Sequence, residues 1–420
     1  SRVRRPARGV YSSKPTQKEL LAMPLRIAAG VVALAFLGVS PAHAQGPAIP
    51  AQSWPDEDWE LSTPAAEGID AKTIAALDAD LRAGRYGYVD AMVVIRHGRI
   101  IAEHSYPRDY ATINAPLIEG EPGPWNYHDA NWHPYFRGSQ LHTLQSTTKS
   151  FASALAGIAI AQGRIRGVDA TLGELLPHRQ ISDPAKAAIT LDNVLTMRPG
   201  FEWLETEVSY WDPRNDSIRV EKTNDWTGYL LAKPLVTAQG STYTYNSTNS
   251  QMISEIVSTA VGKGLDAFAE ETLFGPLGIR EYQWKSAPEG YRDTAGGLYL
   301  SARDLARFGL LFLRGGEWNG KQLIPADWVA RSLETHVRDT EPADPAANFG
   351  YDYQWWVFEH GSEGRPRMVG TWGWGGQFAL LVPALDLVAV FTGWNTYDGQ
   401  EDIAPVLAFY ERVVLPAAAR

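Results

Sequence analysis

The feature that most constrains the fold of this sequence is an apolar segment of helical length that carries a single charge. Residues 146–162 begin Ser-Thr-Thr-Lys, continue with small and large apolar residues, and end before Gly163; Lys149 is the only charged residue among them. A helix that is apolar on every side is buried on every side. We therefore expect the rest of the chain to pack around it, which a sequence of 420 residues with 45% hydrophobic residues can do.

The segments on either side of this helix predict the architecture. Two β-rich runs lie early in the chain and three lie late, at residues 88–96, 100–104, 353–359, 377–382 and 387–392. Amphipathic helices are expected from Asp70 onward and over residues 403–414, and short helical segments broken by Pro and Gly fill the middle. We expect an α+β fold, with an antiparallel five-stranded sheet flanked by N- and C-terminal helices and a mainly helical inserted domain.

These patterns divide the sequence into four parts. They are an extension with a signal peptide (1–44), a Pro-rich lead (45–67), an α/β sheet domain (68–145 and 291–420), and a helical domain (146–290) with Ser146 at the boundary. The loop at 106–140 and the Trp-rich segment 203–226 are expected to form walls of a substrate cleft, because long loops in compact enzymes are usually functional.

The N-terminal region predicts export. From Met23 the sequence shows a basic residue at Arg26, an apolar run over 27–39, and the ending Ala42-His43-Ala44. We interpret the residues before Met23 as an over-extended translation start and expect cleavage after Ala44. The apolar run is shorter than the ~20 residues that span a membrane. The expected location is therefore the bacterial periplasm or the medium, with no membrane span after cleavage.

Composition excludes several function classes. The chain has no cysteine, so disulfides, thiolate zinc sites and a cysteine nucleophile are impossible. Without residues 1–44 it has 31 basic and 47 acidic residues, a formal charge of about −16, which argues against nucleic acid or anionic lipid as partner. His128 and His133 lie in a loop without metal-ligand spacing. We expect no metal, no cofactor, and a small-molecule substrate; the oligomeric state is left open.

Ser146 and Lys149 form a Ser-x-x-Lys pattern at the first turn of the apolar helix. Residues i and i+3 share a helix face, so the lysine amine can reach the serine hydroxyl. Burial lowers the pKa of a lysine and makes a neutral amine available as a base. The alternative is that Ser146 only caps the helix and Lys149 lies at the surface, but a lone buried lysine is unfavourable unless it is used.

Two further segments carry candidate chemistry. Residues 243–247, Tyr-Thr-Tyr-Asn-Ser, precede a predicted helix, and a tyrosine there can relay a proton in a cleft or simply pack. Residues 370–377, Gly-Thr-Trp-Gly-Trp-Gly-Gly-Gln, lead into a predicted strand, where a free N–H can serve as an oxyanion donor. The alternative for the second segment is a Gly-rich hairpin with two stacking indoles.

Together the three segments resemble the serine β-lactamase and penicillin-binding-protein superfamily, in its class-C-like branch of esterases and 6-aminohexanoate-dimer hydrolases. The resemblance covers about residues 80–415 and rests on the order Ser-x-x-Lys, Tyr-x-Asn, then a third motif on a strand. It implies that Ser146 is the acylated nucleophile, Lys149 its proton partner, and Tyr245 rather than Tyr243 the second base. It also implies an oxyanion hole from the N–H groups of Ser146 and Trp374.

Two departures from the family pattern bear on the substrate. Ser247 stands where the second motif has its Asn, with Asn246 adjacent, so either residue is a candidate for that role. Thr371 replaces the Lys or His of the third motif, Thr371-Trp372-Gly373, and a carboxylate at that subsite would lose a charge-assisted contact worth about 1.5 to 3 kcal/mol. We expect Thr371, Trp372 and Gly373 to contact an ester or amide without a carboxylate there.

The sequence leaves other functions open. A D-amino-acid peptidase or weak β-lactamase acting on cell-wall material is the alternative within the enzyme class. A binding or sensor protein that retains the acyl group is the alternative outside it. The main prediction is a serine hydrolase that cleaves esters or amides through an acyl-enzyme on Ser146.

Overall fold

The computed structural model describes residues 53–55, 58–118, 127–338, 340, 349–358, 364–397 and 402–419. The expected signal peptide and most of the Pro-rich lead lie outside the described residues. Within them, no helix is long and apolar enough to cross a membrane.

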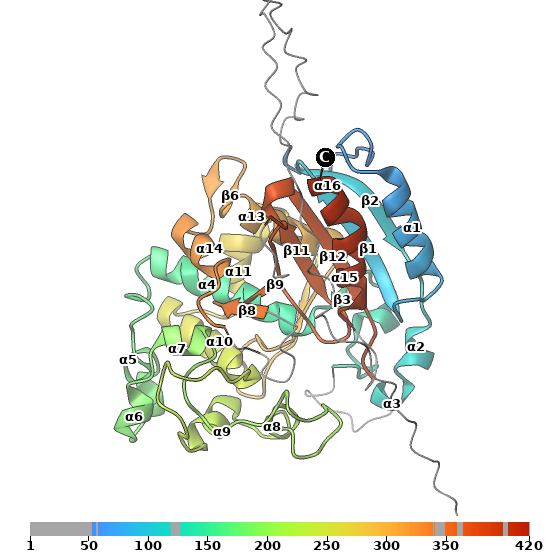
Figure 1. Cartoon of the computed structure of the whole chain (residues 1–420). Helices are drawn as coiled ribbons and strands as arrows, with labels where there is room; N and C mark the ends of the chain where they lie inside the picture. The colour runs from blue at the N-terminus through green and yellow to red at the C-terminus, as the bar shows by residue number, and fades with distance from the viewer. Residues whose placement is uncertain are drawn as a thin grey trace, which may run out of the picture. The chain divides into compact units, whose positions relative to one another are not determined.

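The fold is α+β and is built on an antiparallel sheet to which both ends of the chain contribute (Figure 1). The sheet has seven strands, not the five expected from the sequence. Their order across the sheet is β2 (Arg99–Ser105), β1 (Val89–Arg96), β12 (Leu387–Gly393), β11 (Phe378–Val382), β10 (Met368–Gly370), β9 (Trp355–Phe358) and β8 (Phe349–Asp352).

The two additional strands were missed for identifiable reasons. The run predicted as one strand over 353–359 contains a tight turn, since Tyr353 and Gln354 have φ of 37° and 68° and join β8 to β9. Hairpin turns of this kind are usually marked by Asn or Gly, and neither is present. Strand β10 has only three residues, all buried, so its sequence shows no alternation.

Alternate residues of the central strands face two separate cores. Met92 and Val94 of β1 belong to the core beneath α1 (Ala71–Arg82) and the C-terminal helices α15 (Ala404–Phe409) and α16 (Leu415–Ala418), which cover one face of the sheet (Figure 1). Val93 and Ile95 belong to the other core, beneath α13 (Ala302–Leu313). This period of two is what a sheet buried on both faces requires.

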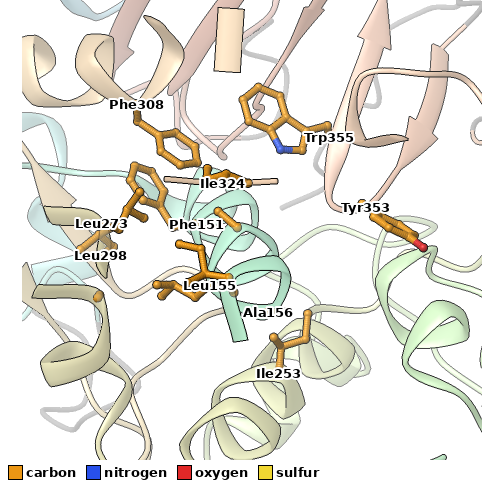
Figure 2. Packing of buried hydrophobic residues seen from close by; sticks show 14 of the residues in the cluster. Phe151, Leu155, Ala156, Ile253, Leu273, Leu298, Phe308, Ile324, Tyr353 and Trp355 are labelled. Carbon is orange, nitrogen blue, oxygen red and sulfur yellow. The ribbon is translucent and has the colours of Figure 1, made fainter. Parts of the chain in front are cut away.

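The apolar segment forms α4 (Thr148–Ala161) and is buried over nearly its whole length, as expected. The Phe151 ring stacks on Phe308 with centroids 3.7 Å apart, and Leu155 and Ala156 lie nearer to Ile253 of α10 (Ser247–Val261) (Figure 2). Helix α4 therefore packs between α13 of the sheet layer and α10 of the helical part. This fixes its first turn in the interior of the molecule.

The remaining helices are short and belong mainly to the middle of the chain. Three of them are α3 (Ala115–Ile118), α8 (Asp216–Val220) and α9 (Trp226–Ala232). The others are α2 (Tyr110–Ile113), α5 (Leu172–Leu175), α6 (Pro184–Ala187), α7 (Leu191–Leu195), α11 (Leu265–Ala269), α12 (Gly275–Leu277) and α14 (Ala326–Ser332). Short strands outside the main sheet are β3 (His142–Thr143), β4 (Gln283–Trp284), β5 (Leu298–Leu300), β6 (Glu317–Trp318) and β7 (Lys321–Gln322).

Candidate active site

Ser146 lies in a short 3-10 turn, Gln145–Thr147, that leads into α4. Gln145, the first residue of the turn, has a left-handed φ of 46°. The Thr147 hydroxyl anchors the turn by donating to Gln377 O at 3.0 Å. Left-handed backbone at a non-glycine residue stores about 1–3 kcal/mol of strain and occurs often at functional sites. Thr147, not Ser146, is the N-cap residue of α4, so the capping alternative does not apply to Ser146.

Lys149 is buried, with 2% of its surface exposed. Its Nζ lies 2.8 Å from Ser146 Oγ and donates to the carbonyl oxygen of Ala295 at 2.7 Å. Burial lowers the pKa of Lys149 to about 8, against opposing contributions from nearby carboxylates, chiefly Glu205 and Asp293. About a tenth of the amine is therefore neutral at pH 7 and can act as a base.

Tyr245 is the tyrosine of the second segment that reaches Ser146. Lys149 Nζ lies 5.1 Å from the centroid of its ring, and Tyr245 and Ser146 line the same cavity. Tyr243 instead packs against Tyr351, with centroids 5.3 Å apart. Burial and the nearby Glu205 raise the pKa of Tyr245 well above its usual range. The phenol is therefore neutral near pH 7.

The two candidates for the Asn of the second motif have different surroundings. Asn246 is the N-cap of α10, and its Oδ1 accepts from Thr248 N at 2.9 Å and Asn249 N at 3.1 Å. Ser247 lines the cavity next to Ser146. The side chain of Asn246 is thus used within the helix, and Ser247 is the one that faces the site.

Glu205 holds this second segment in place, and sequence reasoning missed it. The carboxylate is fully buried and accepts from Ser247 Oγ at 2.6 Å, Ser247 N at 2.9 Å, Tyr210 OH at 2.9 Å and Trp203 Nε1 at 2.7 Å. Four donors compensate a buried carboxylate for lost hydration. Nothing in the sequence distinguishes Glu205 from the exposed Glu202 and Glu207 beside it.

The Gly-rich segment packs directly against the turn that carries Ser146. A Cβ on Gly373 would lie 2.2 Å from the carbonyl oxygen of Leu144, so only glycine fits there. Thr371 is fully buried, and its hydroxyl shares a hydrogen bond with Thr147 Oγ1 and accepts from Ala379 N, each at 3.0 Å. Thr371 therefore supports the framework and lines neither cavity at the site, which does not fit the substrate contact expected for it.

Two cavities meet at Ser146, Tyr210 and Trp374. The larger, of about 280 Å³, is otherwise lined by Pro116, Leu117, Tyr127, His128, Gln145, Trp211, Ser217, Ile218, Glu221, Lys222, Ser247, Ala295 and Gly296. The smaller, of about 180 Å³, is otherwise lined by Thr206, Tyr245, Trp356, Trp372 and Asp402. A substrate bond placed at Ser146 would extend one part into each cavity, and both segments expected as cleft walls contribute to the larger one.

Asp293 holds the segment whose Ala295 carbonyl binds Lys149, and sequence reasoning missed this residue as well. Its Oδ1 accepts from Ala295 N at 2.9 Å and Gly296 N at 3.1 Å, and its Oδ2 accepts from Tyr127 OH at 2.5 Å. These bonds orient the Ala295 carbonyl, which accepts a hydrogen bond from Lys149 Nζ. The carboxylate is fully buried, so its partners provide the compensation that burial of a charge requires.

The histidines of the loop are buried and uncharged. Burial lowers the pKa of His128 to about 3 and that of His133 to about 2. His128 Nδ1 is paired with Tyr110 OH at 2.7 Å, and His133 Nδ1 accepts from Tyr135 N at 3.2 Å. No group of three His, Cys, Asp or Glu side chains within the described ranges could hold a metal ion.

Comparison with known proteins agrees with this geometry. The profile of the family described as Beta-lactamase matches residues 74–404. The 6-aminohexanoate-dimer hydrolase of Paenarthrobacter ureafaciens is 26% identical over 279 residues, which cover 63% of this chain and 69% of that protein.

Solved structures share the fold at low identity. EstCE1, a hydrolase with promiscuous acyltransferase activity, has a TM-score of 0.60 at 16% identity, over 81% of this chain and 97% of its own. A family VIII carboxylesterase has a TM-score of 0.59 at 15% identity, over 82% of this chain and 96% of its own. Since the profile match spans most of the sequence and includes Ser146, Lys149 and Tyr245, this chain belongs to the beta-lactamase family of hydrolases.

Proposed function

We propose that the protein cleaves an ester or amide through an acyl-enzyme on Ser146. The observation that supports this most strongly is the distance of 2.8 Å between Lys149 Nζ and Ser146 Oγ at a buried position that lowers the pKa of the amine to about 8. A nucleophile with a base within hydrogen-bond reach, and a base oriented by a third group, is the arrangement that covalent catalysis needs. Here the third group is the Ala295 carbonyl.

In the proposed acylation, Ser146 Oγ attacks the substrate carbonyl carbon and its proton passes to the neutral amine of Lys149. The N–H groups of Ser146 and Trp374 stabilise the negative charge that develops on the carbonyl oxygen. The bond to the leaving group then breaks, and the leaving oxygen or nitrogen takes a proton from Lys149 by way of the Tyr245 hydroxyl. This route uses Tyr245 as a neutral relay, in keeping with its raised pKa.

In the proposed deacylation, a water molecule attacks the ester on Ser146 and gives its proton to the same base. The carbon–oxygen bond to Ser146 breaks, Oγ recovers a proton, and the acid product leaves. A substrate without a carboxylate is favoured, because Thr371 brings no cation and its hydroxyl is occupied by Thr147 and Ala379.

The covalent intermediate is tested by labelling. A fluorophosphonate probe should add its mass to the peptide that contains Ser146, and the Ser146→Ala variant should remain unlabelled and inactive on short p-nitrophenyl esters. Labelling of a different residue, or hydrolysis retained in Ser146→Ala, would contradict the proposal. The same mass measurement with penicillin distinguishes the alternatives, because an adduct that persists indicates a sensor and an adduct that is hydrolysed indicates a cell-wall enzyme or weak β-lactamase.

The pH dependence of the rate follows from the pKa of Lys149. Only the unprotonated amine can accept the Ser146 proton, so kcat/KM for a p-nitrophenyl ester should rise about tenfold per pH unit below the pKa of about 8 and level off above it. A stopped-flow pH profile between pH 5.5 and about 9.5 measures this. A flat profile across this range would show that Lys149 is not the titrating base.

A further inference from the structure

The smaller cavity contains an acidic group that the proposed reaction does not use. Asp402 Oδ2 accepts from Trp372 Nε1 at 3.3 Å, and the backbone N–H groups of Gly375 and Ile403 also stabilise its charged form. Burial raises the pKa of Asp402 to about 6, which leaves it ionised at neutral pH. In the part of the chain that the structure describes, no Lys or Arg forms an ion pair with it.

Aromatic side chains form most of the remaining wall. We use the name acidic cage for Asp402 together with Tyr210, Trp356, Trp372 and Trp374. The ring centroids of Trp356 and Trp372 are 5.5 Å apart, and those of Tyr210 and Trp374 are 5.7 Å apart. The faces of aromatic rings carry partial negative charge and attract organic cations.

We propose that the acidic cage binds an ammonium group of the substrate, so that the substrate is an ester or amide with a positively charged amine or trimethylammonium on one side of the scissile bond. This inference rests on the proposed function, since the cage shares Ser146 with the reacting centre. A cation entering the cage neutralises a partly buried carboxylate that has no basic partner among the described residues. It also lies beside aromatic rings, which attract a cation more strongly than an anion.

The other charges near the cage are compatible with a cationic ligand. Lys149 Nζ lies 5.1 Å from the centroid of the ring of Tyr245, which lines the same cavity. Its charge interacts favourably with Glu205 and Asp293. A substrate carboxylate in the same cavity would meet Asp402 instead of a basic residue, so the cage selects against carboxylates as well as for cations.

A matched pair of substrates tests the cage. Acetylthiocholine and 3,3-dimethylbutyl thioacetate have nearly the same shape and differ in having a charged nitrogen or a neutral carbon at the branch point. The unmutated full chain should show a kcat/KM ratio of about 10 to 100 in favour of the charged substrate. In Asp402→Asn this ratio should fall to within about threefold of one, and in the surface control Asp327→Asn it should remain at the unmutated value.

A binding measurement separates failure of the cage from failure of the proposed reaction. Tetramethylammonium should change the tryptophan fluorescence of the unmutated chain saturably at constant ionic strength, and neopentyl alcohol should not. Equal rates on the two thioesters, together with no saturable response to tetramethylammonium, would overturn the cage while Ser146 labelling still supports the hydrolase. Saturable binding without any hydrolysis or labelling would support the cage and reject the hydrolase.

Discussion

Lys149→Met should lower kcat/KM for a p-nitrophenyl ester by about 10²- to 10⁴-fold, which is the range that a positioned general base contributes. Methionine fills a similar volume at a site where only 2% of the lysine surface is exposed. The ammonium form no longer has to be desolvated, and this offsets the hydrogen bond lost to the Ala295 carbonyl. We therefore expect the free energy of unfolding to change by less than about 2 kcal/mol.

Steady-state kinetics and a thermal unfolding curve on the same preparation of Lys149→Met measure the change in kcat/KM and the change in the free energy of unfolding. Lys321→Met replaces an exposed lysine of β7 and should leave both quantities unchanged. If Lys149→Met lost activity only in proportion to lost folded protein, the lysine would be structural. Retained activity with an intact fold would assign the base role to another group.

Glu205→Ala should have the largest effect on stability, about 3–5 kcal/mol. The substitution leaves Ser247 Oγ, Tyr210 OH and Trp203 Nε1 without their acceptor in a buried setting, and each buried unsatisfied donor costs about 1–3 kcal/mol. Glu205→Gln should lose less, because an amide keeps the size and one acceptor oxygen. Urea-induced unfolding of the purified variants measures the difference.

Glu202→Ala is the matched control for Glu205→Ala. It removes an exposed carboxylate three residues earlier in the same segment and should change the free energy of unfolding by less than about 0.5 kcal/mol. A similar small effect for Glu205→Ala would mean that the donors find other partners, and that Glu205 does not hold the second segment beside Ser146.

The parts of the fold that could be predicted from sequence are those with a local signal. The apolar helix after Ser146 and the five β-rich runs each carry their own pattern, and all of them fall on observed elements. The turn at Tyr353 and Gln354 could not be recognised, because its left-handed backbone is imposed by the pairing of β8 and β9. Burial of strands on both faces also removes the alternation that reveals a strand.

The candidate site also consists of residues with a local sequence signal and residues placed by tertiary contacts. The structure brings Ser146, Lys149, Tyr245 and Trp374 together, and all four lie in the three segments whose order could be recognised in the sequence. The partners that orient them, Glu205 and Asp293, lie far away in sequence and bond through tertiary contacts.

Asp402 and Thr371 show two ways in which a sequence motif fails to identify the residues that line a site. Asp402 faces the smaller cavity although it belongs to no motif, whereas Thr371 occupies a motif position and faces inward to Thr147. A motif indicates where the backbone passes the site, but the direction of each side chain depends on the neighbouring residues that pack against that backbone. The register of β11 determines this for Thr371, since Ala379 N donates to its hydroxyl.

The position of β12 also determines when the molecule can fold. This strand is the last of the seven in the chain, yet it lies between β1 and β11, where it pairs with both. During synthesis the early hairpin of β1 and β2 has no neighbour on its inner edge until residues 387–393 have been made. Pairing over such a long sequence separation is slow. We therefore expect a nascent chain that stays incompletely folded through most of translation and closes its sheet late, in one cooperative step.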